Sequence, residues 1–148
     1  MDGRLAIMQF DIAVIGGGPG GSATAIAAAR AGLRVVLCEK GPYGRDKVCG
    51  DGLTPRAIAA LDDLKIDHSV AHRIDGLRMI AGKKQRELQW PTTSRFPNHG
   101  AVWPRQRFDN HLLDVAIAAG ADVRFNAEAM PVREGEEVVG VEVNGEVL

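Results

Sequence analysis

The sequence has few cysteines, no long apolar run and no excess of charge of either sign. Its 148 residues include only Cys38 and Cys49, which are too few for a disulfide framework and fit a reducing compartment. No apolar stretch approaches the ~18 residues of a membrane-spanning helix, and no signal-peptide core follows the opening residues. The 18 basic and 19 acidic residues give a net charge of −1, so the total charge does not attract nucleic acid. We expect a cytoplasmic chain, long enough for one domain with a sizeable core.

The most informative stretch lies near the start of the chain. An apolar run at residues 10–15 leads into the glycine-rich segment Gly16–Gly21 and then into an alanine-rich stretch that stops near Gly32. A second apolar run at residues 35–38 is followed directly by Glu39. This pattern predicts a strand, a tight turn, a helix and a second strand ending in an acid, which is the dinucleotide-binding fingerprint in its full context.

Each glycine of the turn has a physical role in that fingerprint. Gly16 can adopt the tight turn after the strand, Gly18 lets the backbone approach a pyrophosphate, and Gly21 lets the helix pack close to the sheet. Pro19 suits the first helical position because it has no N–H to leave unpaired. The free N–H groups and partial positive charge of this helix start suit a phosphate.

Glu39 is the predicted ribose ligand. Its carboxylate can accept hydrogen bonds from ribose hydroxyls, and its charge would repel a 2′-phosphate, so NADP is disfavoured at this site. The adjacent Lys40 weakens that argument. The alternative interpretation, an ordinary strand–turn–helix with incidental glycines, fits the combination of strand, helix and spaced acid less well.

A polar loop at residues 41–53 follows, and it contains Cys49, Gly50 and Gly52. From composition alone, a wall for a bulky cofactor and a surface loop without a ligand are equally good interpretations. Thr54 and Pro55 then predict a helix start.

The rest of the chain predicts two short strands around residues 82–84, a helix over residues 105–118, and strands near residues 120–125, 129–133 and 138–143. Arg105 stands where the helix dipole disfavours a cation, which indicates either an anionic partner or a solvated arginine. His68 and His72 have a metal-like spacing but no third ligand nearby, so a surface pair is the better interpretation and we expect no metal. Asn144-Gly145 is a strong hairpin signal with few residues after it, so we expect a truncated chain.

The chain resembles the geranylgeranyl reductase family of flavoproteins, within the larger para-hydroxybenzoate hydroxylase type of FAD enzymes. Four segments carry the resemblance, and the motif at Lys47–Pro55 is the most specific. Trp90-Pro91, Gly100–Val102 and Arg105 resemble the menaquinone reductase branch in particular. The segments are Gly16–Ser22, Glu39-Lys40, Lys47–Ala57 and Arg105–Asp109.

The resemblance implies a Rossmann-like α/β FAD-binding domain over residues 10–148, after an N-terminal extension at residues 1–9, truncated before the substrate domain. It implies FAD as the cofactor and an isoprenoid lipid as the substrate, with an external electron donor and a possible peripheral membrane contact. The residues implied in cofactor binding are Gly16, Gly18, Gly20, Gly21, Ser22, Glu39, Lys40, Cys49, Gly50, Gly52, Arg105 and Ala129.

The expected reaction is reduction of a double bond in a menaquinone or geranylgeranyl chain, in which the flavin carries the hydride. No side chain stands out as a catalytic acid, so no catalytic residue is predicted. Two alternatives remain open at this point: an FAD-dependent monooxygenase, and an inactive FAD-binding fragment.

Overall fold

A computed structural model of the chain describes residues 10–148 and divides it into two compact units. The first contains the chain up to Arg45 and again from Phe108 to Leu148, and the second contains Asp46–Arg107. The predicted extension at residues 1–9 lies outside the described residues.

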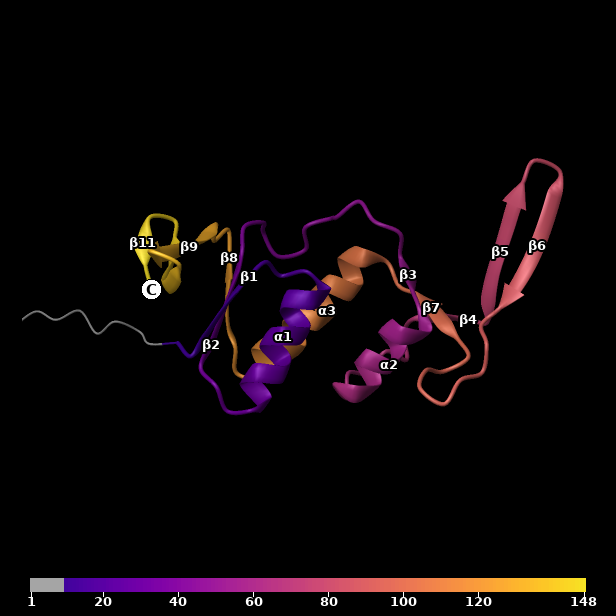
Figure 1. The fold of residues 1–148 in the computed structure, drawn as a ribbon, viewed down its shortest axis with the longest axis horizontal. Coiled ribbons are helices and arrows are strands. Elements are labelled where there is room, and N and C mark those ends of the chain that lie inside the picture. The colour runs from indigo at the N-terminus through magenta and orange to yellow at the C-terminus, as the bar shows by residue number, and fades with distance from the viewer. Residues whose placement is uncertain (1–9) are drawn as a thin grey trace, which may run out of the picture. The chain divides into compact units, whose positions relative to one another are not determined.

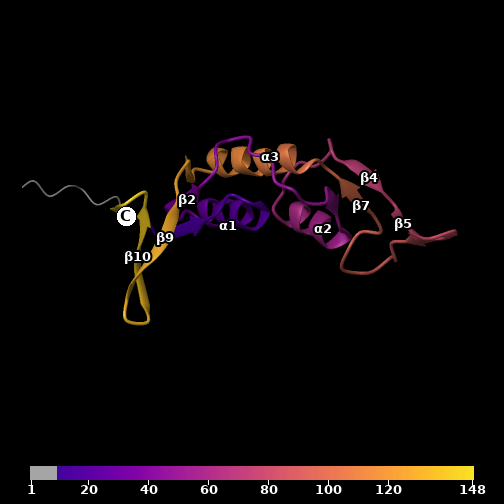
Figure 2. The same ribbon diagram turned by 90° about the horizontal axis from the view of Figure 1, so that it is seen from above.

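The first unit is built on a three-stranded parallel sheet with the order β1-β2-β8 (Figure 1). Its strands are β1 (Ile12–Ile15), β2 (Val35–Glu39) and β8 (Asp122–Phe125). Helix α1 (Pro19–Arg30) joins β1 to β2, and α3 (Arg105–Ala118) precedes β8. Both helices lie on the same face of the sheet, as two right-handed crossovers in one direction require (Figures 1 and 2).

Strand β2 is the centre of this unit, and all five of its residues are buried. On the face away from the helices, Val36 and Cys38 pack against Val141 and Val143 of a second sheet. That antiparallel sheet has the order β11-β10-β9 and lies on the opposite side of the parallel strands from the helices (Figure 2). Its strands are β9 (Ala129–Glu134), β10 (Glu137–Val143) and β11 (Glu146–Val147).

The second unit contains a small antiparallel sheet and a separate hairpin. The sheet has the order β3-β7-β4, formed by β3 (Gly52–Leu53), β7 (Gly100–Val102) and β4 (His72–Ile74). Helix α2 (Pro55–Asp63) follows β3, and the Thr54 side chain accepts a hydrogen bond from the Ala57 N–H, which caps the helix. The hairpin consists of β5 (Gly76–Ala81) and β6 (Lys84–Gln89), which pair as a two-stranded sheet (Figure 1).

The elements predicted from the sequence are confirmed. The glycine-rich turn leads into α1, which ends before Gly32, and α3 ends before Gly120; both glycines have positive φ values, +83° and +100°. The β3-β7-β4 sheet was not predicted. Within residues 10–148, every helix is too short or too polar to cross a membrane.

Candidate functional site

The turn between β1 and α1 requires glycine at two positions. Gly16 has a φ of +102°, and its N–H donates a 2.8 Å hydrogen bond to the Cys38 carbonyl of β2. A Cβ on Gly21 would overlap the carbonyl oxygen of Gly16 and would lie 3.2 Å from Val14 Cγ1. The turn can therefore hold α1 this close to β1 only without side chains at these two positions, as the sequence predicts.

Gly18 and Gly20 differ from those two glycines because the space beside them is open. A Cβ on either residue would meet no other atom within 4 Å. Gly18 is the N-cap of α1 and supplies no side-chain cap, and the first turn of the helix contains no acid. The start of α1 thus combines partly exposed backbone, open space and the positive end of the helix dipole, and this combination fits a phosphate group.

Ser22 is fully buried and directed toward the protein. Its hydroxyl donates a 3.4 Å hydrogen bond to the Gly17 carbonyl, and its N–H donates to the Gly18 carbonyl. Through these two hydrogen bonds Ser22 stabilises the glycine-rich turn between β1 and α1. Its direct contact with the cofactor stays a prediction.

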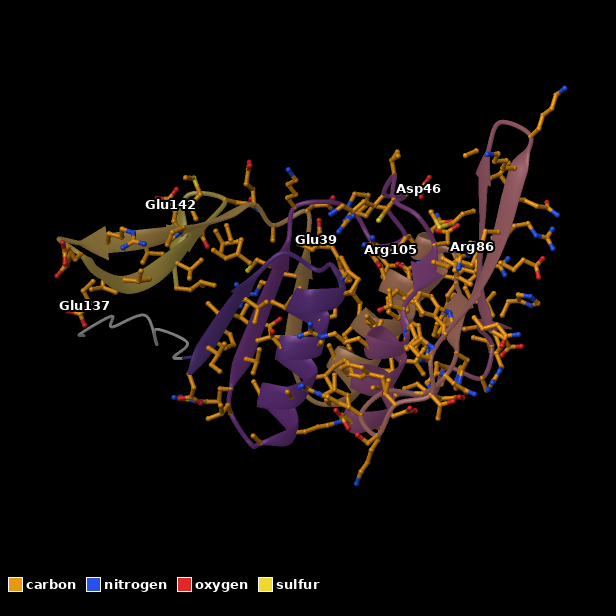
Figure 3. The ribbon with its side chains drawn as sticks, turned by 45° about the vertical axis from the view of Figure 1, so that its right-hand side comes forward. Glu39, Asp46, Arg86, Arg105, Glu137 and Glu142 are labelled. Atoms are coloured by element: carbon orange, nitrogen blue, oxygen red, sulfur yellow. The ribbon has the colours of Figure 1, made fainter. Side chains whose placement is uncertain are left out.

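Glu39 lies at the carboxyl end of β2 and is only 4% exposed (Figure 3). The Gly17 N–H donates to Oε2 at 2.7 Å and the Gly41 N–H donates to Oε1 at 2.9 Å. The guanidinium of Arg45 completes the set, with Nε 3.0 Å from Oε1 and Nη2 3.1 Å from Oε2. A Cβ on Gly17 would lie 3.1 Å from Glu39 Cβ, so Gly17 also leaves room for this side chain.

The ionisation of Glu39 is set by two opposing effects. Burial raises the pKa of the carboxyl, and the hydrogen bonds from Gly41, Arg45 and Gly17 lower it. The hydrogen bonds outweigh burial, so the pKa of Glu39 lies below its ordinary value. Glu39 is therefore an anion at neutral pH and can act only as an acceptor.

The segment that leads into β9 runs beside the end of β2. The Ala127 N–H donates to the Glu39 carbonyl and the Asn126 N–H donates to the Gly41 carbonyl, both at 3.0 Å. Ala129 begins β9, pairs with Val143 and packs against the apolar cluster behind β2. The first unit thus brings together the glycine-rich turn, Glu39 and the segment around Ala129, with Lys40 exposed next to Glu39.

The other predicted site residues belong to the second unit. Cys49, Gly50 and Gly52 are exposed, and a Cβ on either glycine would meet nothing within 4 Å. Asp51, between the glycines, joins this loop to the start of α3. Its carbonyl accepts a bond from the Trp103 N–H and its Oδ1 accepts one from the Arg105 N–H, both at 2.9 Å. The loop and the start of α3 are therefore held together by Asp51.

Sequence reasoning missed four residues that organise these two groups. Gly17 and Gly41 donate to Glu39 through their backbones, Arg45 pairs with it, and Asp51 caps α3 from a distant loop. A cation six residues after the predicted ribose ligand, within a glycine-bearing loop, was the available signal for Arg45. Among residues 10–148, no cluster of three or more metal-ligating side chains occurs.

Comparisons with known proteins cover most of the chain. The family model described as FAD dependent oxidoreductase matches residues 11–147. The menaquinone reductase of Mycobacterium tuberculosis is 42% identical over 127 residues, which are 82% of this chain and 30% of that protein.

Two solved structures have a similar fold. A geranylgeranyl bacteriochlorophyll reductase-like protein of Thermoplasma acidophilum is 34% identical, with a TM-score of 0.74 over 93% of this chain and 36% of that one. The myxobacterial chondrochloren halogenase, an FAD-dependent enzyme, is 30% identical, with a TM-score of 0.75 over 94% of this chain and 34% of that one. The chain thus spans about a third of the length of the proteins it matches.

Proposed function

Because the chain belongs to the FAD dependent oxidoreductase family, we propose that it forms the FAD-binding part of a reductase that acts on isoprenoid chains. The substrate would be a prenyl lipid such as menaquinone or a geranylgeranyl lipid. An external donor would supply the electrons, and reaching such a lipid would involve a peripheral membrane contact.

The chain's own residues fit the FAD that the family uses. The glycine-rich turn and the start of α1 would bind the pyrophosphate through Gly16, Gly18, Gly20 and Gly21, and Glu39 would accept hydrogen bonds from the adenosine ribose. FAD supplies the hydride chemistry when bound. The protein supplies binding and orientation, and no side chain within residues 10–148 stands out as a proton donor.

The loop around Cys49 is the observation that favours an isoprenoid reductase over other flavoenzymes. Fold similarity alone does not choose between these functions, since the TM-scores to the reductase-like protein and to the halogenase are 0.74 and 0.75. The sequence Lys47–Pro55 resembles the geranylgeranyl reductase family, and a relative named menaquinone reductase is 42% identical. In the proposed complex Cys49, Gly50, Gly52 and Arg105 would lie on the flavin side of the cofactor.

Exchanging this segment between enzymes tests the proposal. Residues 11–147, which the family model matches, would replace the corresponding segment of the Mycobacterium tuberculosis menaquinone reductase, and mass spectrometry would measure saturation of the menaquinone side chain. We expect the chimera to retain FAD and activity. The same chimera carrying Gly18→Val should lose FAD, because a branched side chain would occupy the open space beside the turn.

The matched control places the same residues in the chondrochloren halogenase, where we expect halogenation to be lost. A chimera that halogenates its substrate and does not saturate menaquinone would contradict the proposed substrate class. Retention of FAD by the Gly18→Val chimera would contradict the pyrophosphate assignment.

A further inference from the structure

Both oxygens of the Glu39 carboxylate are engaged. Oε2 accepts hydrogen bonds from the Gly17 N–H and from Arg45 Nη2, and Oε1 accepts one from the Gly41 N–H and lies 3.0 Å from Arg45 Nε in an ion pair. A carboxylate offers about four lone-pair positions, so these four contacts surround it. The two hydroxyls of a ribose would need two of the same positions.

Of the three donor residues, only Arg45 contacts Glu39 through its side chain. The Gly17 N–H lies in the turn between β1 and α1, and Gly41 is held by the bond from the Asn126 N–H to its carbonyl. Arg45 reaches Glu39 through a flexible side chain that is 24% exposed. Its guanidinium pairs with both carboxylate oxygens as a fork, which is how a vicinal diol would also donate.

The backbone between Glu39 and Arg45 leaves space for the arginine side chain. A Cβ on Gly41 would lie 2.6 Å from Arg45 Cδ, so any other residue at position 41 would displace the arginine stem. Gly44 has a φ of +79°, and the Arg45 N–H donates to the Pro42 carbonyl, which turns the loop back toward Glu39. Arg45 therefore contacts Glu39 through a specific local structure.

We propose that Arg45 occupies the ribose-diol position of Glu39 in the cofactor-free protein and is displaced when a nucleotide binds. This inference rests on the proposed placement of the adenosine ribose at Glu39. Arg45 acts here as a positioning residue: it keeps the carboxylate ionised and oriented, and it competes with the diol. Only the fraction of molecules with Arg45 withdrawn can bind the ribose, so the apparent affinity is reduced by that fraction.

Calorimetric titration of the full chain with ADP and with 2′,3′-dideoxy-ADP tests the proposal. Arg45→Met keeps the apolar stem and removes the donors, and we expect ADP to bind roughly tenfold more tightly. Binding of the dideoxy nucleotide should not change, because it has no diol to compete with the guanidinium. Arg45→Lys, which cannot form the fork, should lie between Met and wild type.

Two further variants isolate the effect. In a Glu39→Gln background, replacing Arg45 should give no gain for ADP, because the carboxylate that both groups need is absent. Arg34→Met is the matched control, since Arg34 forms a similar two-pronged pair with Asp11 elsewhere in the same unit. It should leave ADP binding unchanged, and circular dichroism would confirm that each variant is folded.

Several outcomes would overturn the proposal. Weaker ADP binding by both Arg45→Met and Arg45→Lys would show that the arginine holds the nucleotide itself. An equal gain for ADP and the dideoxy nucleotide, or no gain at all, would show that Arg45 does not compete with the diol. In these cases wild-type binding of ADP would leave the nucleotide site standing, whereas failure of the wild type to prefer ADP over the dideoxy form would remove the ribose from Glu39.

Discussion

Strand β2 and the β5–β6 hairpin both carry large apolar side chains and differ almost completely in burial. All five residues of β2 are buried, whereas eleven of the twelve residues in the hairpin strands are exposed. The hairpin nevertheless carries large apolar side chains, among them Leu77, Met79 and Ile80, which are 47%, 59% and 69% exposed. The strands form in both places, but only β2 is covered on both faces by other elements.

This difference shows where the fold gains its stability. Burial of apolar surface contributes about 25 cal/mol per Å², and β2 obtains this on both faces from α1 and from the β9–β11 sheet. An isolated two-stranded hairpin is marginal in water. The candidate ribose ligand, Glu39, is the last residue of the buried strand, so the most stable part of the chain positions the site.

The largest difference is expected in the thiol reactivity of the two cysteines, one in β2 and one in an exposed loop of the second unit. Cys38 of β2 is 2% exposed, and burial raises the pKa of its thiol, whereas Cys49 lies exposed in the loop of the second unit. Cys38 can react only after the sheet opens. We expect a thiol reagent to modify Cys49 at least roughly a thousandfold faster, which corresponds to an opening free energy of about 4 kcal/mol.

Single-cysteine variants, Cys49→Ser and Cys38→Ala, would separate the two labelling rates, and urea should make them equal. Binding of FAD should slow the labelling of Cys49, because the proposed cofactor site includes this loop. Comparable rates in the native protein would show that β2 opens as readily as a surface loop.

Truncating one leucine in each region should give the next largest effect. Leu37 of β2 is fully buried, so Leu37→Ala should lower the free energy of unfolding by about 3 kcal/mol. Leu77 of β5 is the matched control, and Leu77→Ala should change stability by no more than about 0.5 kcal/mol. Urea unfolding of both variants measures the difference. A large loss from Leu77→Ala would mean that the hairpin is buried in solution.

The sequence predicted the elements whose signals are local. The glycine-rich turn, α1 and β2 follow from apolar periodicity and from backbone positions that only glycine can occupy, and the β10–β11 hairpin follows from Asn144-Gly145. The sheet of β3, β7 and β4 escaped prediction because its strands have only two or three residues, and their pairing joins segments that lie far apart in the chain.

The candidate site likewise contains residues that the sequence predicted and contacts that it did not. Gly16, Gly21 and Glu39 were predicted because their roles depend on residue type and spacing. The bond from the Arg105 N–H to Asp51 was not, because it depends on how a loop folds back over 54 positions. Arg45 lies only six residues from Glu39, yet a loop conformation fixed by a positive φ decides their contact.

The smallest difference is expected between substitutions of two glutamates, Glu39 and Glu87, in their effect on the free energy of unfolding, and it should appear only at acidic pH. The pKa of Glu39 is lowered in the folded protein, because its hydrogen bonds outweigh the opposing effect of burial. Its stabilising contribution is therefore complete above the unfolded pKa of about 4.3 and is lost as pH falls through the lower folded value. Since burial and hydrogen bonding oppose each other, the resulting slope of stability with pH should be modest.

Glu39→Gln removes the titrating group, so it should flatten the loss of stability below pH 4 in urea unfolding measured at several pH values. Glu87 of β6 is the control, since its pair with Arg78 joins two side chains that are 65% and 61% exposed. Such surface pairs contribute at most about 1 kcal/mol, so Glu87→Gln should leave the acid limb nearly as steep as in the wild type. If Glu87→Gln flattened the dependence of unfolding free energy on pH as much as Glu39→Gln, the buried carboxylate would contribute no more to acid stability than a surface carboxylate does.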